Sequence, residues 1–465
     1  MLKYTHHVAA FFLFCTMASS SLRADEATIG WHSVDEIVAK ISAPRFADRE
    51  FDVTDYGADG KGKKNSQVAI NKAIDACHDA GGGRVLVPAG EYRVDGPIRL
   101  RSNVNLHLAA ESTLLFSTQP SDYLPNVFTR FEGTELMNYS PPIYAFGESN
   151  IGLTGKGTID GQASHDNWWK WKGRWSGSSK SDWKKGDPDQ STALEKLLSQ
   201  AAEGVAPEER VYGEKSLLRS NFVQPYRCQN VLIEGITVKN SPMWCLHPVL
   251  CENVVVRGVT VDSHGPNNDG CNPESCRYVL IEDCTFDTGD DCIAIKSGRN
   301  SDGRRLNTPS EFYVIRNCRM RDGHGGVVLG SEMSGGVRNI FVEDCEMDSP
   351  NLERAIRLKS NSMRGGYLEN LFVRNVKVGQ VSDAVLRVNL HYADETGDYP
   401  PVVRNIYIEN LTSEKSKYAF YFRGLEDHPI ESITIRNCTF AGAAKPSIIE
   451  HVKELSLEEV MMPLK

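Results

Sequence analysis

The sequence has little of what a membrane protein or a nucleic-acid binder needs. The apolar stretch from Val8 to about Ala18 is shorter than the roughly 20 residues of a transmembrane helix. The 465 residues carry a formal net charge of -9, with a pI near 5.8. This acidic balance excludes a general binder of nucleic acids or anionic membranes, because such proteins normally carry net positive charge.

The sequence also lacks the ligand spacings of familiar metal and phosphate sites. Cys271 and Cys276 are too loosely spaced for zinc, and no second ligand pair follows at a recognised distance. The stretch GADGKGKK, from Gly57, nearly spells a phosphate-binding loop, but Lys64 occupies the position where the motif needs serine or threonine. We therefore expect a turn there, and neither a metal nor a cofactor in this protein.

The first residues have the layout of a secretory signal peptide. A basic start, the short apolar run and a small-residue ending at Ala24 predict a leader over residues 1–24. We expect an exported protein, periplasmic or secreted, with an N-terminal segment over 25–50 and one domain over 51–465. One of the 12 cysteines lies in the leader, so at least one thiol of the mature chain is unpaired or pairs between chains.

One short phrase recurs through the second half of the chain. Each copy is an apolar strand, a polar pair and a further short strand, and the copies follow each other at roughly 23 to 35 residues. A period of this length indicates stacked units, which bury an apolar face by coiling into a parallel β-helix. The copies begin at Asn230, Asn253, Tyr278, Tyr313, Asn339, Asn370, Asn405 and Ser432, with weaker copies at Asn103 and Asn150.

A helix is predicted ahead of the repeats. In NSQVAINKAIDACHDAGGG, apolar residues recur at i, i+3, i+4 and i+7 from Ile70 to Cys77. Asn65 or Ser66 can cap its start, and Gly81 its end. Because a solenoid needs its open end covered, we expect this helix to be the lid.

Four cysteines occupy the same place in their copies of the repeat: Cys284, Cys318, Cys345 and Cys438. We favour an interior stack of small apolar side chains over disulfides, although export would permit them.

A long insertion, about 163–225, interrupts the repeat. Its first part, from Ala163, holds five of the seven tryptophans among basic residues. Two interpretations remain open: a packed surface flap, or a wall that closes one end of a cleft and stacks on sugar rings.

Three carboxylates are expected to share one patch of the coil. Residues one repeat apart become neighbours about 4.8 Å apart. Asp269 precedes the adjacent pair Asp290 and Asp291 by about one short turn. Close carboxylates raise one another's pKa, so that one can stay protonated as general acid while another is ionised as base. Hydrolysis of a glycosidic bond requires this division of roles.

The next rungs add an imidazole and two cations. His324 follows one rung on, and Arg357 and Lys359 follow one rung later. Residues at i and i+2 of a strand point to the same side, so these two cations face outward together. Cations beside the acids suit an anionic substrate and would orient a carboxylate on a sugar ring.

At these residues the sequence resembles glycoside hydrolase family 28, the polygalacturonases and their relatives, and most of all their bacterial exo-acting branch. The family's N-T-D reads Asn267-Asn268-Asp269, and its R-I-K reads Arg357-Leu358-Lys359. Its G-D-D ends in Asp290 and Asp291, and its G-H-G contains His324. The resemblance covers nearly the whole mature chain, and its two departures, Asn268 and Leu358, remove no catalytic group.

The resemblance implies a right-handed parallel β-helix that hydrolyses α-1,4-galacturonosidic bonds of pectin with inversion and no metal. It implies that Asp290 is the proton donor, that Asp269 and Asp291 activate the water, and that His324 supports the acid. Arg357 and Lys359 would hold the uronate carboxylate. For inversion we expect Asp290 and one other acid to lie about 6.5–9.5 Å apart, which leaves room for the water.

His247 and Asn267 lie on rungs beside the acids, where they either line the sugar site or serve the structure. Three alternatives stay open. The substrate could be another pectic backbone such as rhamnogalacturonan, the enzyme could be a calcium-dependent pectate lyase, or the chain could be a non-catalytic carbohydrate-binding β-helix. We expect a monomer whose partner is a pectic polysaccharide or oligogalacturonide.

Overall fold

The fold was analysed in a computed structural model that describes residues 29–175, 180 and 182–462. The predicted signal peptide, residues 1–24, lies outside these residues. Among the residues described, no helix is both long and apolar enough to cross a bilayer.

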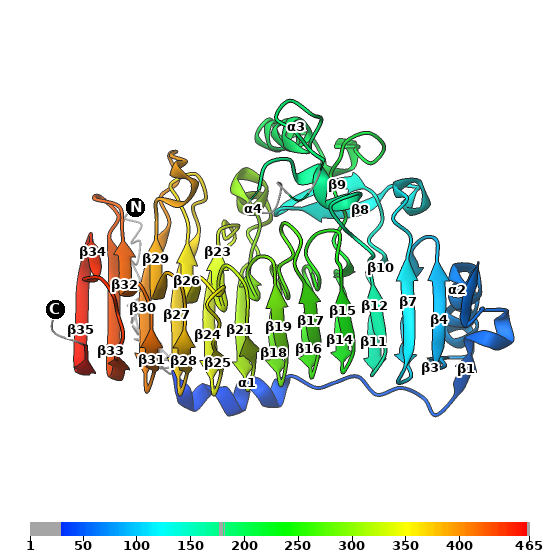
Figure 1. The fold of residues 1–465 in the computed structure, drawn as a ribbon, viewed down its shortest axis with the longest axis horizontal. Helices are drawn as coiled ribbons and strands as arrows, with labels where there is room; N and C mark the ends of the chain where they lie inside the picture. Colours follow the sequence, from blue (N-terminus) through cyan, green and yellow to red (C-terminus); the bar gives the residue numbers. More distant parts are fainter. Residues whose placement is uncertain (1–28, 176–179, 181, 463–465) are drawn as a thin grey trace, which may run out of the picture.

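Parallel strands stack into one long coil, a right-handed parallel β-helix (Figure 1). Each strand pairs with its counterpart one turn later, as Val231 does with Val254 and Val254 with Val279. All eight strong copies of the repeat phrase supply successive strands of one ladder, which confirms the predicted fold class.

Three ladders run along the coil. The first contains β1 (Glu50–Asp52), β3 (Gly83–Val87), β6 (Val104–Leu108), β11 (Ser149–Gly155), β14 (Gln229–Glu234), β16 (Glu252–Arg257), β18 (Arg277–Glu282), β21 (Ser310–Arg316), β24 (Val337–Glu343), β27 (Tyr367–Arg374), β30 (Val402–Glu409), β33 (Ile430–Phe440) and β35 (Val452–Met461). The second contains β2 (Lys61–Asn65), β4 (Gly90–Val94), β7 (Ser112–Phe116), β12 (Thr158–Asp160), β15 (Thr237–Lys239), β17 (Thr260–Ser263), β19 (Thr285–Thr288), β22 (Arg319–Met320), β25 (Glu346–Met347), β28 (Lys377–Gln380) and β31 (Thr412–Lys415).

The third ladder carries the functional residues. It begins with β5 (Ile98–Arg99), β10 (Ile143–Phe146) and β13 (Val223–Tyr226), and it continues with β20 (Ile293–Ile295), β23 (Val327–Gly330), β26 (Arg354–Lys359), β29 (Ala384–Asn389), β32 (Tyr418–Arg423) and β34 (Ile448–Glu450). Single bridges through Leu246 and Cys271 join Val223 of β13 to Ile293 of β20, so the ladder is continuous.

The backbone conformation at the start of each copy explains why so many copies of the repeat begin with asparagine. Asn230, Asn253 and Asn370 have φ between 55° and 59°, a left-handed conformation that asparagine tolerates better than most residues. Their side chains also bond from rung to rung: the Asn253 amide donates to Asn230 at 2.7 Å, and Asn230 donates to Asn150 at 2.8 Å. The ladder of amides fixes the turn at the start of each copy.

The cysteines of the repeat lie in the interior. All 11 cysteines among the described residues are free and buried, including Cys284, Cys318, Cys345 and Cys438. The preference for an interior stack over disulfides is therefore confirmed. These thiols join the continuous apolar core with the valines and isoleucines of the same strands.

The predicted lid is present. Helix α2 (Gln67–Asp79) packs against the first strands and buries Ile70, Ala73, Ile74 and Cys77. Of the two candidate caps, Asn65 accepts the N–H of Gln67 at 2.9 Å. In the preceding GADGKGKK, residues 57–60 form the predicted turn, whereas residues 61–64 belong to β2, and the Asp59 carboxylate accepts the N–H groups of Lys63 and Lys64.

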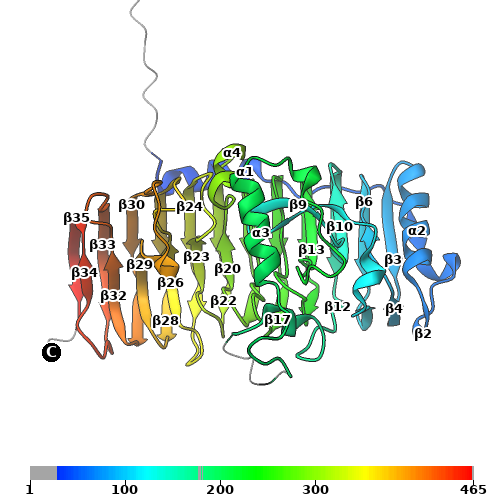
Figure 2. The same cartoon turned by 90° about the horizontal axis from the view of Figure 1, so that it is seen from above.

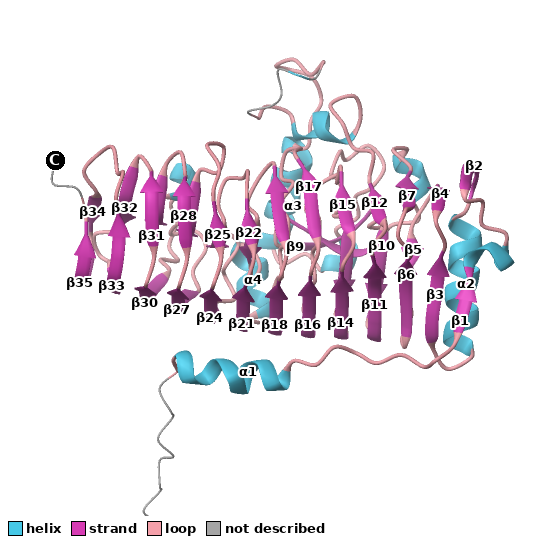
Figure 3. Ribbon diagram, turned by 60° about the horizontal axis from the view of Figure 1, so that its bottom comes forward, coloured by secondary structure: helices cyan, strands magenta, loops and turns pink. Residues whose placement is uncertain are grey.

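The N-terminal segment forms a strap that the sequence analysis did not anticipate. Helix α1 (Val34–Lys40) lies across the outer face of the first ladder (Figure 3). It buries Val34 and Ile37 on an outward-facing stripe of apolar side chains, one from each of six consecutive rungs. This stripe consists of Leu232, Val255, Leu280, Val314, Phe341 and Phe372.

Two excursions from the coil stand over the third ladder (Figures 1 and 2). The first, also unanticipated, is the antiparallel hairpin of β8 (Val127–Phe131) and β9 (Thr134–Asn138). The second lies between β12 and β13 and carries α3 (Ser191–Ala202). Both are joined to α4 (Asn300–Leu306): Asp302 binds Arg210 at 2.9 Å and accepts the Glu135 N–H at 2.8 Å.

Candidate active site

A cleft of about 560 Å³ opens on the outer face of the third ladder, beside the two excursions. Six of the eight residues singled out from the sequence line it: Asn267, Asp269, Asp290, His324, Arg357 and Lys359. Asp291 lies directly behind its wall, whereas His247 lies elsewhere. The repeat therefore brings the acids, the imidazole and the two cations together as predicted.

The register of the coil places the acids. The N–H of Gly270 donates to the Asp291 carbonyl at 3.0 Å, so Asp269 and Asp291 occupy adjacent rungs. The N–H of His324 donates to the Asp290 carbonyl at 3.0 Å, which places the imidazole one rung beyond that acid. Carboxylate oxygens of Asp269, Asp290 and Asp291 all lie within 4.8 Å of one another.

This separation corrects the spacing expected for an inverting enzyme. Inverting acid and base typically lie about 6.5–9.5 Å apart, whereas retaining pairs lie about 5–5.5 Å apart. The nearest oxygens here are closer than either range, at no more than 4.8 Å. The prediction of a wide pair is wrong because side chains stacked on adjacent rungs inherit the strand spacing of the coil. The carboxyl spacing thus gives no support to inversion.

Asp291 is held as a carboxylate by two cations. Lys359 Nζ lies 2.6 Å from Oδ2 and Arg357 Nη1 lies 3.1 Å from Oδ1. Burial opposes ionisation, but the charges of Lys359 and Arg357 outweigh it and lower the pKa of Asp291. Ile356 and Leu358, between and beside the cations, are buried inward, as the alternation of a strand predicts.

Asp290 and His324 form an ion pair at the cleft surface. His324 Nδ1 lies 3.0 Å from Asp290 Oδ1. The Asp290 charge raises the pKa of His324 to about 9, against the effect of burial. Although burial also opposes ionisation of Asp290, the His324 charge and hydrogen bond lower the pKa of that acid. At neutral pH the pair therefore holds one proton, and it resides on the imidazole.

Asp269 differs from the other two acids. Burial, followed by the charge of Asp290, raises its pKa to about 8. It accepts one hydrogen bond from Asn272 Nδ2 at 2.8 Å, and Lys296 Nζ lies 3.8 Å away. Near pH 7 the proton retained by the carboxylates is therefore on Asp269, whereas the sequence analysis placed it on Asp290.

The three acids have a separation that a metal ion could bridge, but their oxygens already bind cations of the protein. Both oxygens of Asp291 contact Lys359 or Arg357, and one oxygen of Asp290 contacts His324. A metal would have to compete with these fixed positive charges.

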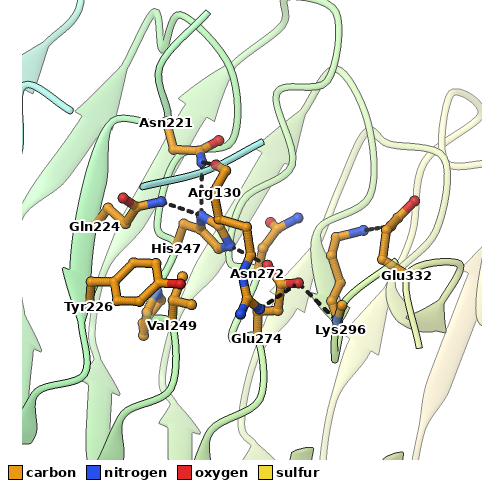
Figure 4. A network of polar contacts seen from close by, with 12 residues as sticks. Arg130, Asn221, Gln224, Tyr226, His247, Val249, Asn272, Glu274, Lys296 and Glu332 are labelled. Atoms are coloured by element: carbon orange, nitrogen blue, oxygen red, sulfur yellow. Dashed lines mark hydrogen bonds and ion pairs between the residues drawn. The ribbon is translucent and has the colours of Figure 1, made fainter. Parts of the chain in front are cut away.

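His247 lies outside the cleft and serves the structure (Figure 4). Its side chain is fully buried, and Asn221 and Gln224 both donate to Nδ1, at 2.8 and 3.0 Å. Its Nε2 lies 2.8 Å from Glu274. Of the two roles considered for His247, the structure therefore favours the structural one, because every polar atom of the ring has a partner within the protein.

The two asparagines before Asp269 divide their roles. Asn267 faces the cleft and accepts a hydrogen bond from Arg219 at 2.7 Å. Asn268 is fully buried, accepts from Ser263 Oγ at 2.6 Å and donates to Met243 O at 3.0 Å. Asn268 thus fixes the loop that carries Asp269.

Several cleft residues were missed from the sequence. They are Trp244, Lys296, Arg299, Glu332, Arg364 and Tyr392. A signal for Lys296 existed: Ile295 pairs with Leu329, and Leu329 with Leu358, so Lys296 occupies the ladder position of Lys359. The phrases IAIKS and IRLKS align with each other and place both lysines on the outer face.

The tryptophan-rich stretch is in part a packed surface flap and in part a wall of the cleft. Trp168 and Trp169 pack with Tyr123 and Tyr139 in a buried cluster, and Trp169 Nε1 donates to Ser241 O at 2.9 Å. Trp175 instead lines the cleft. The flap is therefore packed at its base and contributes to the wall at its edge.

Comparison with known proteins gives concordant results. The profile of glycosyl hydrolases family 28 matches residues 213–459, and a profile described as rhamnogalacturonase A/epimerase, pectate lyase-like, matches residues 51–114. A probable polygalacturonase of Vitis vinifera is 28% identical over 84% of this chain and 74% of its own. An exo-poly-alpha-D-galacturonosidase of Dickeya chrysanthemi is 29% identical over 77% of this chain and 62% of its own.

Among solved structures, a hyperthermoactive exopolygalacturonase from Thermotoga maritima superimposes with a TM-score of 0.89. It is 45% identical, and the match covers 93% of this chain and 95% of that one.

Proposed function

Since the chain belongs to glycosyl hydrolases family 28, whose profile covers more than half of it, we propose that it hydrolyses α-1,4-galacturonosidic bonds of pectin from a chain end. The chain is a glycoside hydrolase. One observation carries the substrate assignment: Arg357 and Lys359 meet the acids at the wall of the cleft, where a hexuronate carboxylate would find two cations.

Asp290 is the proposed proton donor, supplied by His324. The ion pair of these residues holds one proton at neutral pH, and Asp290 faces the cleft. When a glycosidic oxygen approaches, that proton passes from the imidazole through the carboxyl group to the leaving oxygen. The leaving sugar departs as an alcohol, and His324 is neutral until solvent reprotonates it.

Asp269 and Asp291 are the proposed base for the attacking water. Asp291 is ionised, and Asp269 retains a proton below about pH 8, so the two together carry about one negative charge near neutrality. One charge suffices to accept one proton from the water as its oxygen bonds to the anomeric carbon. Lys359 and Arg357 stabilise this charge and the uronate beside it.

Exo action is supported by the shape of the cleft and by the relatives. The wall includes Glu132 of the β8–β9 hairpin and Lys172 and Trp175 of the long insertion. A wall of this kind would stop a polymer from passing through and would admit its end. The Dickeya and Thermotoga proteins are both named as exo-acting enzymes.

The test is to incubate the purified protein with polygalacturonate, with and without a chelator, and to follow saturated products by chromatography and unsaturated ends by ultraviolet absorbance. Early release of mono- or digalacturonate with little loss of viscosity is expected, and a chelator should change nothing. Calcium-dependent unsaturated products would overturn the assignment in favour of a lyase, and a rapid fall in viscosity would overturn exo action.

A second substrate class deserves a parallel assay. The profile matching residues 51–114 carries the name rhamnogalacturonase A/epimerase, which favours a rhamnogalacturonan backbone as the alternative. Release of products from rhamnogalacturonan at a higher kcat/KM than from polygalacturonate would establish that alternative.

We also propose that the protein is exported and acts as a monomer with one catalytic domain over residues 51–465. Peptide mapping of the protein from periplasm and medium tests export, its mass in solution tests the monomer, and limited proteolysis tests the single domain.

A further inference from the structure

Two guanidinium groups in the cleft converge on a carboxylate that the proposed chemistry does not use. Arg364 Nη1 lies 3.2 Å from Oε2 of Glu395, and Arg299 Nη2 lies 3.9 Å from Oε1. Asn361 Nδ2 donates to Oε2 at 3.2 Å. Arg299, Arg364 and Glu395 all line the cleft. The protein therefore already contains a site whose geometry suits one carboxylate.

The two arginines are held in place without Glu395. Arg364 Nη1 also donates to Asn300 Oδ1 at 2.7 Å, and Arg299 Nη1 binds Glu132 at 2.8 Å. Their side chains are 2% and 10% exposed, whereas that of Glu395 is 36% exposed. The cations are thus fixed parts of the wall, and the carboxylate is the member that solvent or a ligand reaches.

Glu395 lies on a loop rather than on the ladder. It directly follows the short helix η7 (Tyr392–Asp394), between β29 and β30. A loop side chain can leave its partners at lower cost than a group fixed on a strand. If Glu395 leaves, Arg299 keeps its ion pair with Glu132, and Arg364 keeps its hydrogen bond to Asn300 and the charge of nearby Glu332.

We propose that Arg299 and Arg364 form a second uronate-binding subsite, in which the carboxylate of the terminal sugar of the substrate takes the place of Glu395. This inference rests on the proposed exo-acting hydrolysis of a galacturonan. Arg299 is joined through Glu132 to the β8–β9 hairpin, which lines the cleft, so the subsite lies beside this hairpin. Arg357 and Lys359 serve a different sugar, beside the acids.

Replacement of Glu395 by the substrate carboxylate would allow the cleft to select substrates whose terminal sugar is a uronate. A terminal uronate offers a carboxylate that can bind guanidinium groups in a planar, paired arrangement. A neutral terminal sugar offers only hydroxyl groups, and Glu395 would keep its place. Specificity then comes from competition between the enzyme's own carboxylate and that of the substrate.

Binding measurements separate this subsite from catalysis. In an Asp290→Asn background, calorimetry compares trigalacturonate with an analogue whose terminal carboxyl is reduced to the alcohol. We expect Arg364→Gln to weaken binding of the acid by about tenfold or more and to leave the analogue nearly unaffected. We expect Glu395→Gln to tighten binding of the acid severalfold, because the competing carboxylate has lost its charge.

Glu353→Gln is the matched control, since it removes a similarly exposed carboxylate from the same cleft, 38% exposed, away from the arginine pair. It should leave the preference for the acid end unchanged. Weaker binding of the acid in Glu395→Gln, as in Arg364→Gln, would show that the three residues only brace the loop and would overturn the inference. Failure of the unmodified protein to hydrolyse polygalacturonate would instead contradict the proposed function, while the binding data still decide the subsite.

Discussion

The imidazole of His324 lies 3.0 Å from the carboxylate of Asp290, one rung further along the coil. The charge of each group holds the other ionised, so the pair stores a proton at the cleft surface. Proton donation is therefore a property of the pair rather than of Asp290 alone.

Asp290→Asn should lower kcat on oligogalacturonides by about 10² to 10⁴, the usual contribution of a general acid. The loss should be far smaller on an aryl galacturonide with an acidic phenol as leaving group, because that group needs no proton. Asp291→Asn should lose activity on both substrates alike. If the aryl substrate restores the activity of Asp269→Asn and not that of Asp290→Asn, then Asp269 is the proton donor.

The pH dependence of kcat/KM should fall on the alkaline side. His324 has a pKa raised to about 9, so the pair with Asp290 holds its proton at pH 7 and loses it as the pH rises through that value. Asp269, whose pKa is raised to about 8, belongs to the base, and the loss of its proton removes no donor. In His324→Gln the imidazole that holds the proton of the pair up to about pH 9 is gone, and Asp290 must hold that proton itself, so the alkaline fall should move to lower pH and kcat should decrease. An optimum that stays in place would contradict the shared proton.

Lys359→Met should destabilise the protein by about 3–5 kcal/mol, because it leaves the buried Asp291 carboxylate short of a partner. Asp291→Asn combined with Lys359→Met should recover much of that loss, since the uncompensated charge is removed. Unfolding in urea of both variants and of Asp291→Asn alone measures the coupling. Additive losses would mean that the two residues do not interact energetically.

Ile37→Ala in the strap should lower the free energy of unfolding by about 2–5 kcal/mol, as for other buried isoleucines. Activity at low temperature should be unchanged, because the strap covers the first ladder and the cleft opens on the third. Glu36→Ala, an exposed change in the same helix, is the control and should be within about 0.5 kcal/mol of the parent.

Native protein should react slowly with a thiol reagent and should react with all eleven described cysteines once denatured, with or without prior reduction. If prior reduction increases the number of cysteines that react, a disulfide is present, and this would contradict the interior stack of free thiols.

The sequence predicted those features that depend on register. Once the copies of the repeat were aligned, the outward positions of Arg357 and Lys359 and the rungs of Asp269, Asp290 and His324 followed from periodicity alone. Lys296 obeys the same rule and was overlooked, because its carboxylate partner Glu332 belongs to no motif.

Features that depend on side-chain direction or on chain outside the repeat were not predictable in this way. The prediction of a wide spacing between the acids was wrong. Residues on adjacent rungs lie close together, and this closeness also limits the distance between their carboxylate oxygens. The β8–β9 hairpin lies between two weak copies, where no period reveals it. Helix α1 was missed although a signal existed: Leu232, Val255 and Leu280 are apolar yet point away from the core, which requires a cover.

The strap also determines an order of events during synthesis. Residues 34–40 leave the ribosome early, but the surface they cover is assembled from rungs as distant as Phe372. Helix α1 therefore waits without its partners until more than half of the coil has wound. Once the coil has wound, only the short segment of residues 41–49 separates the helix from β1, so its docking would mark the completion of folding rather than its start.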